Sequence, residues 1–184
     1  GNKNGPEGAL TYTGVTSIMG TSMMGTDKAI VVQKMVNQYV KSNAIYPSEA
    51  LAVGGAPDIV TFCGILYDEA VAENIKPEIM YAQAMLETGY LKYGGIVQVW
   101  QFNFGGIGAV DGNAPGGCAI FSDVRTGLRA QVQHLKAYAS KETLNNSCVD
   151  PRFNMVTRGT APYVEWLGQK ENPNVNSKGD SYGW

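Results

Sequence analysis

The chain has 184 residues, of which 44% are hydrophobic and 16% are charged, so it is long enough for one well-buried domain and too short for two of ordinary size. Fourteen Lys and Arg residues against sixteen Asp and Glu give a formal net charge of -2. With no basic run, this balance argues against nucleic acid as the partner. No apolar stretch is long enough for a membrane span and no apolar signal core begins the chain, so we expect a soluble protein.

The thiols and the imidazole do not form a metal motif. The cysteines Cys63, Cys118 and Cys148 lack C-x-x-C spacing, and His134 is the single histidine. We therefore expect neither a metal nor another cofactor. Cys63 lies on an apolar helical stripe and is predicted to be a core residue. Cys118 and Cys148 lie in loop-like sequence, where they either pair in an oxidising compartment or remain free thiols.

The periodicity along the chain predicts a mainly α protein. Residues 1–25 have no sustained period and predict an extended arm, followed by a single domain over 26–184. Four helices are predicted in that domain: from Thr26 or Asp27, from Pro57 to about Asn74, from Pro77 to about Leu91, and from Asp123 to about Ser140. Residues 46–56 are predicted to be a connector, and a short helix is predicted to end at Gly168. The Gly-rich residues 92–122 predict an irregular loop with at most a short hairpin.

Glu87 is the most informative side chain of the third predicted helix. It follows Met85 and Leu86 near the helix C-terminus. Apolar neighbours and the negative end of the helix dipole both disfavour a charged carboxylate, so its pKa is expected to rise. A carboxyl group of this kind suits general acid chemistry at a glycosidic oxygen. The alternative for an isolated Glu is an exposed helix residue without a catalytic role.

Two linked motifs carry a family resemblance. Residues 82–89 read Ala-Gln-Ala-Met-Leu-Glu-Thr-Gly, and residues 101–108 read Gln-Phe-Asn-Phe-Gly-Gly-Ile-Gly. In this order they resemble the family 73 glycoside hydrolases, which are bacterial cell-wall N-acetylglucosaminidases. The resemblance covers roughly residues 58 to 184 and leaves out the N-terminal arm. It implies a lysozyme-like α fold with a long Gly-rich loop or short hairpin at the cleft.

The resemblance also implies roles for individual residues. Glu87 would be the general acid, and Tyr163 matches a Tyr that lies near the cleft in the family. The implied substrate-binding residues are Gln101, Asn103, Phe104 and Gly106, the glycine letting the backbone approach the N-acetyl group. Tyr90 and Trp100 flank these motifs and could stack on sugar rings, although core packing explains them equally well.

The second catalytic group is where this sequence departs from the family pattern. Many members carry a further Glu on a hairpin lobe, whereas between Ile107 and Ile120 the one acid here is Asp111. The second group is therefore Asp111, Asp123, or no carboxylate at all, with the acetamido oxygen of the substrate attacking instead. Asp123 also stands where it can cap the fourth helix.

The resemblance thus implies a secreted or cell-surface enzyme that acts as a monomer on the glycan strands of peptidoglycan. It would hydrolyse β-1,4 bonds after N-acetylglucosamine. A lytic transglycosylase on the same polymer is the alternative within enzymes. A non-catalytic domain that binds cell-wall sugars is the alternative from another class.

Overall fold

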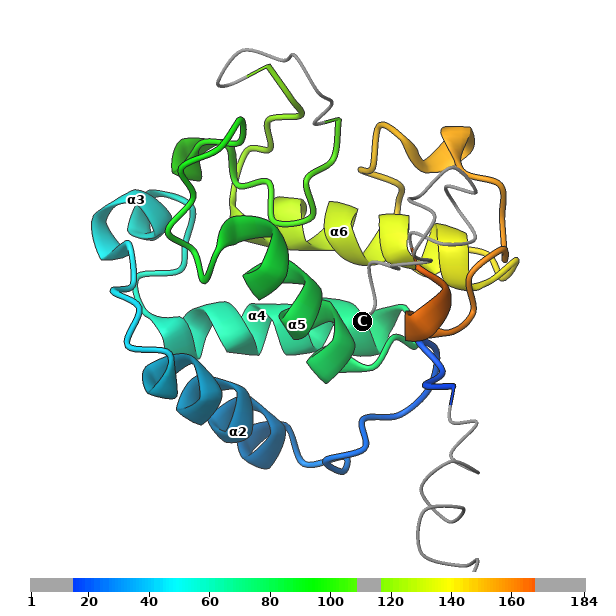
Figure 1. Cartoon of the computed structure of the whole chain (residues 1–184), viewed down its shortest axis with the longest axis horizontal. Coiled ribbons are helices and arrows are strands. Elements are labelled where there is room, and N and C mark those ends of the chain that lie inside the picture. Colours follow the sequence, from blue (N-terminus) through cyan, green and yellow to red (C-terminus); the bar gives the residue numbers. More distant parts are fainter. Residues whose placement is uncertain (1–14, 109–116, 168–184) are drawn as a thin grey trace, which may run out of the picture.

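The computed structural model describes residues 15–108 and 117–167. In these ranges the chain forms α-helices and short 3-10 turns, with two isolated β-bridges and no strand (Figure 1). The elements in chain order are α2 (Lys28–Lys41), α3 (Ser48–Val53), α4 (Ile59–Ala72), α5 (Pro77–Thr88), η1 (Val99–Gln101), α6 (Val124–Ala139), η2 (Phe153–Met155) and η3 (Val164–Trp166). The mainly α prediction is confirmed for this part of the chain. No helix in the described ranges is both long and apolar enough to cross a membrane.

Side-chain caps set three of the helix starts. Asp27 accepts a hydrogen bond from the Ala29 N–H at 3.0 Å. Asp58 and Asp123 each accept one from the N–H three residues later, at 2.7 Å. Such caps satisfy backbone donors that have no partner inside the helix. The starts predicted at Asp27 and Asp123 are therefore confirmed.

Three predicted boundaries differ from the structure. The predicted connector over 46–56 contains α3, whose six residues are too few to show a helical period. The helix predicted to reach Leu91 ends at Thr88, because Gly89 adopts the left-handed conformation (φ 56°, ψ 53°) that stops a helix. The short helix predicted before Gly168 is only the three-residue turn η3.

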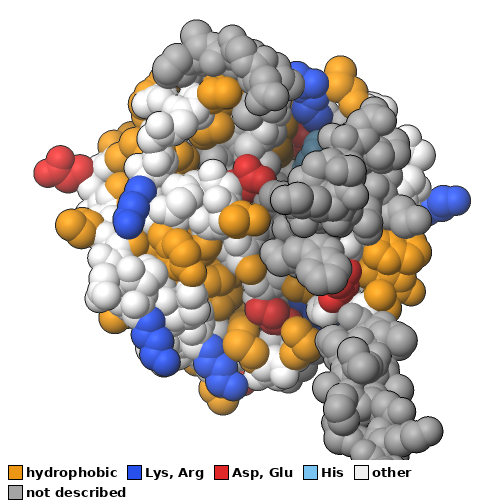
Figure 2. All heavy atoms as spheres, in the orientation of Figure 1, with side chains coloured by type: hydrophobic (Ala, Val, Ile, Leu, Met, Phe, Trp, Pro, Cys, Tyr) orange, Lys and Arg blue, Asp and Glu red, His pale blue; other side chains and the backbone are white. Residues whose placement is uncertain are grey.

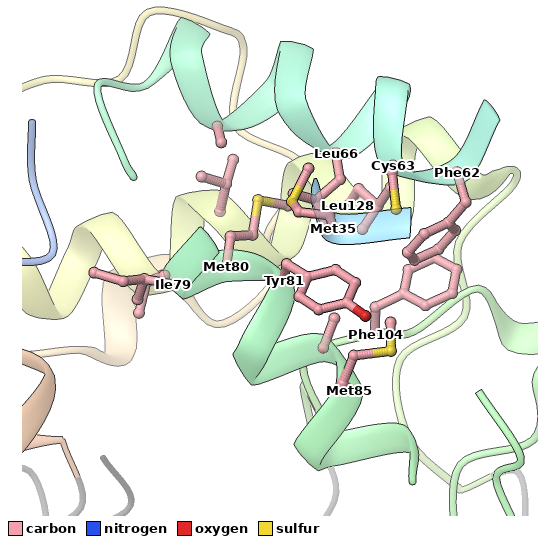
Figure 3. Close-up of a cluster of buried hydrophobic side chains, with 14 of the residues drawn as sticks. Met35, Phe62, Cys63, Leu66, Ile79, Met80, Tyr81, Met85, Phe104 and Leu128 are labelled. Carbon is pink, nitrogen blue, oxygen red and sulfur yellow. The ribbon is translucent and has the colours of Figure 1, made fainter. Parts of the chain in front are cut away.

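Helix α4 is the centre of the packing. It contacts α2, α5 and α6, and Figure 1 shows it between α2 and α6 with α5 crossing in front. Phe62 of α4 meets Phe104 edge to face, with ring centroids 5.1 Å apart. In Figure 3, Tyr81 and Met85 of α5 turn toward the same cluster. This buried contact fixes the Gly-rich segment against the helices.

Two buried carboxylates, Glu69 in α4 and Glu73 at its C-cap, pair with basic residues of α6. Glu69 accepts hydrogen bonds from the Arg129 guanidinium at 2.9 and 3.0 Å. Glu73 is fully buried and lies 3.0 Å from the Lys136 ammonium. Removing Glu73 would leave the buried ammonium of Lys136 without its ion-pair partner, and breaking a buried pair in this way typically costs about 3–5 kcal/mol. The two pairs therefore fix the register of α6 on α4.

Residues 15–20 join distant parts of the chain. Ser17 forms a β-bridge with Tyr163, and Met19 forms one with Ile75. Ile18 between them is fully buried. This part of the predicted arm is therefore extended and packed on the domain, and residues 1–14 lie outside the described ranges.

Gly127, in the first turns of α6, is predicted to be intolerant of a side chain. A Cβ there would lie 1.7 Å from the Phe102 carbonyl oxygen, so Gly127→Ala must displace the backbone. We expect a loss of about 1–3 kcal/mol or more, measured by urea unfolding. Gly64→Ala in α4 is the matched control, because its Cβ meets only the end of Lys28 at 3.9 Å. A helix interior favours Ala over Gly by about 1 kcal/mol, so a loss in Gly64→Ala as large as in Gly127→Ala would contradict this account.

Acid is predicted to weaken the attachment of residues 15–20. Burial raises the pKa of Glu165, but hydrogen bonds from the backbone N–H groups of Thr16 and Glu165 outweigh it, so the pKa lies below its ordinary value. A carboxyl with a lowered folded-state pKa stabilises the fold above its unfolded pKa, and this stability is lost as the pH falls through the folded value. Between neutral pH and about pH 3, wild type should therefore lose more unfolding free energy than Glu165→Gln. Equal losses in urea unfolding would refute this role for Glu165.

Candidate active site

Glu87 lies in the last turn of α5 and is exposed. The two residues before it in sequence do not enclose it, because Met85 is buried in the core with 2% of its surface exposed, whereas Leu86 is 61% exposed. Successive helix residues point about 100° apart, so these three side chains leave the helix in different directions. The prediction that Met85 and Leu86 give Glu87 an apolar environment is therefore wrong, and Glu87 is exposed.

A pocket of about 230 Å³ opens beside this carboxylate. It lies between the end of α5 and the Gly-rich segment, and Glu87 is the one acidic side chain among its described lining residues. The lining consists of Glu87, Thr88, Gly89, Tyr93, Gly95, Ile96, Val97 and Gly106. A reacting group in this pocket would therefore meet one carboxyl group among three glycines and a few uncharged residues.

Gly106 faces the carboxylate directly. A Cβ at this position would lie 2.7 Å from Glu87 Oε2, and its φ of +65° disfavours other residues. In this structure the backbone at Gly106 approaches Glu87, while its predicted approach to an N-acetyl group stays a prediction. The bare backbone leaves room for the carboxylate at the pocket wall.

The chain after Glu87 is held in an uncommon conformation. Tyr90, Leu91 and Tyr93 all have left-handed φ angles, of 56°, 63° and 58°. Such conformations are uncommon for non-glycine residues and persist when their surroundings fix them. Thr88 supplies that support: its hydroxyl donates to the Ala84 carbonyl at 2.7 Å and accepts from the Leu91 N–H at 2.9 Å. Sequence reasoning missed this role of Thr88, which precedes the glycine that ends α5.

Tyr93 forms part of the pocket wall. Its hydroxyl is buried and has no hydrogen-bond partner among the described residues. Burial raises the pKa of this phenol, so it is neutral at physiological pH. Tyr93 therefore contributes a neutral aromatic surface beside Glu87.

The polar residues of the second motif support the loop. Gln101 is fully buried, where its Oε1 accepts from the Gln98 N–H at 2.6 Å and its Nε2 donates to the Cys118 carbonyl at 3.2 Å. Asn103 bonds both backbone groups of Ile107, at 2.8 and 3.0 Å. With Phe104 buried in the core, these three residues shape the loop and do not line the pocket. This differs from the substrate-binding role that the resemblance implied.

The other predicted site residues are not among those that line the pocket with Glu87. Asp123 caps α6 through the Thr126 N–H. Tyr163 packs edge to face on Trp166, with ring centroids 4.9 Å apart. Trp100 is 54% exposed, and Tyr90 lines a neighbouring groove.

The structure therefore brings Glu87 together with Gly106 and separates the remaining predicted residues from this pocket. Asp111 lies outside the described residues.

Thiol chemistry has little support in this fold. Cys63 is buried in the core as predicted, and burial raises the pKa of its thiol to about 12, so it stays protonated. Cys118 and Cys148 are separate thiols. His134 Nδ1 lies 2.7 Å from the buried Asp150 carboxylate. Among the described residues no group of three His, Cys, Asp or Glu side chains could hold a metal ion.

Comparisons with known proteins give a relative without an assigned activity. The chain is similar to an uncharacterized protein of Borreliella burgdorferi, with 47% identity over 97 residues. The match covers 53% of this chain and 47% of the relative, so the chain matches about half the length of that protein. No family model matches the chain, and no solved structure gives a significant match.

Thr88→Val is predicted to loosen the turn that follows Glu87. Valine keeps the shape of Thr88 but leaves the buried Leu91 N–H without its acceptor, which should cost about 1–3 kcal/mol. Hydrogen exchange of the Leu91 amide, followed by NMR, should become markedly faster. Thr88→Ser retains the hydroxyl and should keep Leu91 protected, so equally fast exchange in both variants would show that the hydroxyl is not the support.

Proposed function

We propose that this protein is a glycoside hydrolase that cuts β-1,4 bonds after N-acetylglucosamine in bacterial peptidoglycan, with Glu87 as the general acid. The observation that carries the proposal is the exposed carboxylate of Glu87 against Gly106 in a pocket with no other acid among its described lining residues. The motifs that resemble family 73 glycoside hydrolases supply both sides of this pocket. The same resemblance supports a lysozyme-like fold and action at the cell wall, outside the cytoplasm.

The chemistry follows from the position of Glu87. In its protonated form it would donate a proton to the glycosidic oxygen as the bond to the anomeric carbon breaks. Its exposure lets a polymer reach it, and Gly95 and Gly106 in the pocket lining have no side chains to obstruct a sugar. The substrate would therefore lie between the end of α5 and the Gly-rich segment.

The reaction also needs a group that attacks the anomeric carbon, and Glu87 is the one acidic side chain among the described lining residues of the pocket. Asp123 is engaged as a helix cap and is not among the described lining residues, whereas Asp111 lies outside the described residues. The second group is therefore Asp111 or no carboxylate at all, in which case the acetamido oxygen of the substrate attacks the anomeric carbon. Water then completes the hydrolysis.

The same observation supports one alternative reaction. A lytic transglycosylase also uses a single acid, and it closes a ring in the product in place of adding water. The two reactions differ by the mass of one water in the product, so mass spectrometry separates them.

Glu87→Gln should abolish the release of reducing ends from purified peptidoglycan and leave the fold unchanged. The amide keeps the size of the side chain but cannot donate the proton. General acid catalysis contributes about 10² to 10⁴ in rate, and we expect a loss of that order or more. Glu49→Gln, at an exposed Glu in the first turn of α3, is the matched control and should retain full activity.

Thermal unfolding of both variants is measured beside this assay to show that each of them is folded. A folded Glu87→Gln protein with activity within a few-fold of wild type would exclude Glu87 as the proton donor. Wild-type protein that binds purified cell walls but releases no product would instead support a sugar-binding domain.

A further inference from the structure

A second cavity is lined by residues of α5 and α2 and by Tyr90. We call it the α2–α5 groove. It has a volume of about 440 Å³ and is lined by Gln38, Tyr81, Ala82, Met85, Leu86 and Tyr90. Met85 and Tyr81 are buried and form its floor, whereas Leu86 is exposed at its rim. The groove thus combines an apolar floor with a few polar atoms.

These polar atoms form a directed chain of hydrogen bonds. The Tyr81 hydroxyl donates to Gln38 Oε1 at 2.5 Å. Gln38 Nε2 in turn donates to the Tyr90 hydroxyl oxygen at 2.6 Å. Because the Tyr90 oxygen accepts this bond, its own proton remains available to an acceptor that enters the groove. The chain therefore presents one oriented O–H donor.

Tyr90 is fixed before any ligand arrives. Its N–H donates to the Met85 carbonyl at 2.8 Å, and its carbonyl accepts from the Tyr39 hydroxyl at 3.3 Å. Its ring packs against that of Tyr39, with centroids 6.2 Å apart. A donor held in this way loses little conformational freedom on binding, which favours affinity.

The groove is continuous in sequence with the Glu87 pocket. Leu86 and Tyr90 line the groove, and residues 87–89 between them line the pocket. Neighbouring Cα atoms are about 3.8 Å apart, so the two sites are separated by a single turn of chain. The groove therefore lies close enough to the pocket for one glycan strand to reach both.

The chemistry of the lining selects a neutral, amphipathic ligand. None of the six lining residues carries a charge, although Figure 2 shows acidic and basic side chains scattered elsewhere over the same face of the molecule. A charged peptide or a phosphate would find no opposite charge here. A pyranose ring has an apolar C–H face for Met85 and Leu86 and oxygen acceptors at its edge for the Tyr90 hydroxyl.

We propose that the α2–α5 groove is a second sugar-binding site, which holds a part of the glycan strand outside the Glu87 pocket. This inference rests on the proposed function, because it takes the polymer in the pocket to be a β-1,4-linked amino sugar. Binding at two neighbouring sites would hold a long strand in place through successive cuts.

The test is an NMR titration of ¹⁵N-labelled Glu87→Gln protein with chitohexaose, which carries no peptide. We expect shifts of the Gln38 side-chain amide, which reports the groove, and of the Thr88 and Gly89 backbone amides, which report the pocket. In the same background, Gln38→Ala removes the donor that orients Tyr90 and should weaken binding about three- to tenfold. Gln33→Ala is the matched control, because Gln33 is exposed on α2 outside the groove and the change should leave affinity unaltered.

Each outcome separates the two proposals. A Gln38 amide that stays in place while Thr88 and Gly89 shift would overturn the sugar site and leave the proposed function standing. A shift at Gln38 alone supports the groove and counts against the Glu87 pocket. No shift at either site at millimolar sugar would overturn the groove as a sugar site. A response of Gln38 to a free stem peptide and not to chitohexaose would also overturn it.

Discussion

The stop of α5 at Thr88 and Gly89 is the constraint on which the rest of the site depends. Gly89 takes the left-handed conformation that ends the helix, and the Thr88 hydroxyl bonds both the last turn and the chain that leaves it. Three further left-handed residues follow at once. This reversal exposes Glu87, brings the chain back as the pocket wall at Tyr93, and places Tyr90 in the α2–α5 groove. One helix terminus thus organises both cavities.

The helices behind this terminus provide the rigidity that the turn needs. Helix α4 packs against α2, α5 and α6, and its carboxylates Glu69 and Glu73 pair with basic residues of α6. Phe104 joins the Gly-rich segment to Phe62 of α4. The segment opposite Glu87 is therefore anchored by core packing, while Gly106 keeps the backbone bare where it faces the carboxylate. A rigid segment with a bare backbone at this point suits a site that a substrate must approach closely.

The sequence predicted the helices with strong periods and clear caps, because apolar spacing and N-cap chemistry act locally. It missed α3, which is too short to show a period, and it extended α5 past Gly89. It predicted apolar surroundings for Glu87 from adjacent residues, although helix geometry sends Met85 and Leu86 elsewhere. The motif residues Gln101 and Asn103 are polar because they bond the backbone of their own loop, a contact that spacing alone does not reveal. The chain from Gln38 to Tyr81 and Tyr90 joins two helices far apart in sequence, so no local pattern indicated it.

The central claim is that the pocket beside Glu87 hydrolyses the glycan of peptidoglycan, and the chemical end left by the reaction tests it most directly. Purified peptidoglycan would be digested with the full chain, reduced with borohydride and examined by mass spectrometry. The account predicts a new reducing end on N-acetylglucosamine and products that have gained one water per cut. A new end on N-acetylmuramic acid, an anhydro product or the absence of any product would contradict it.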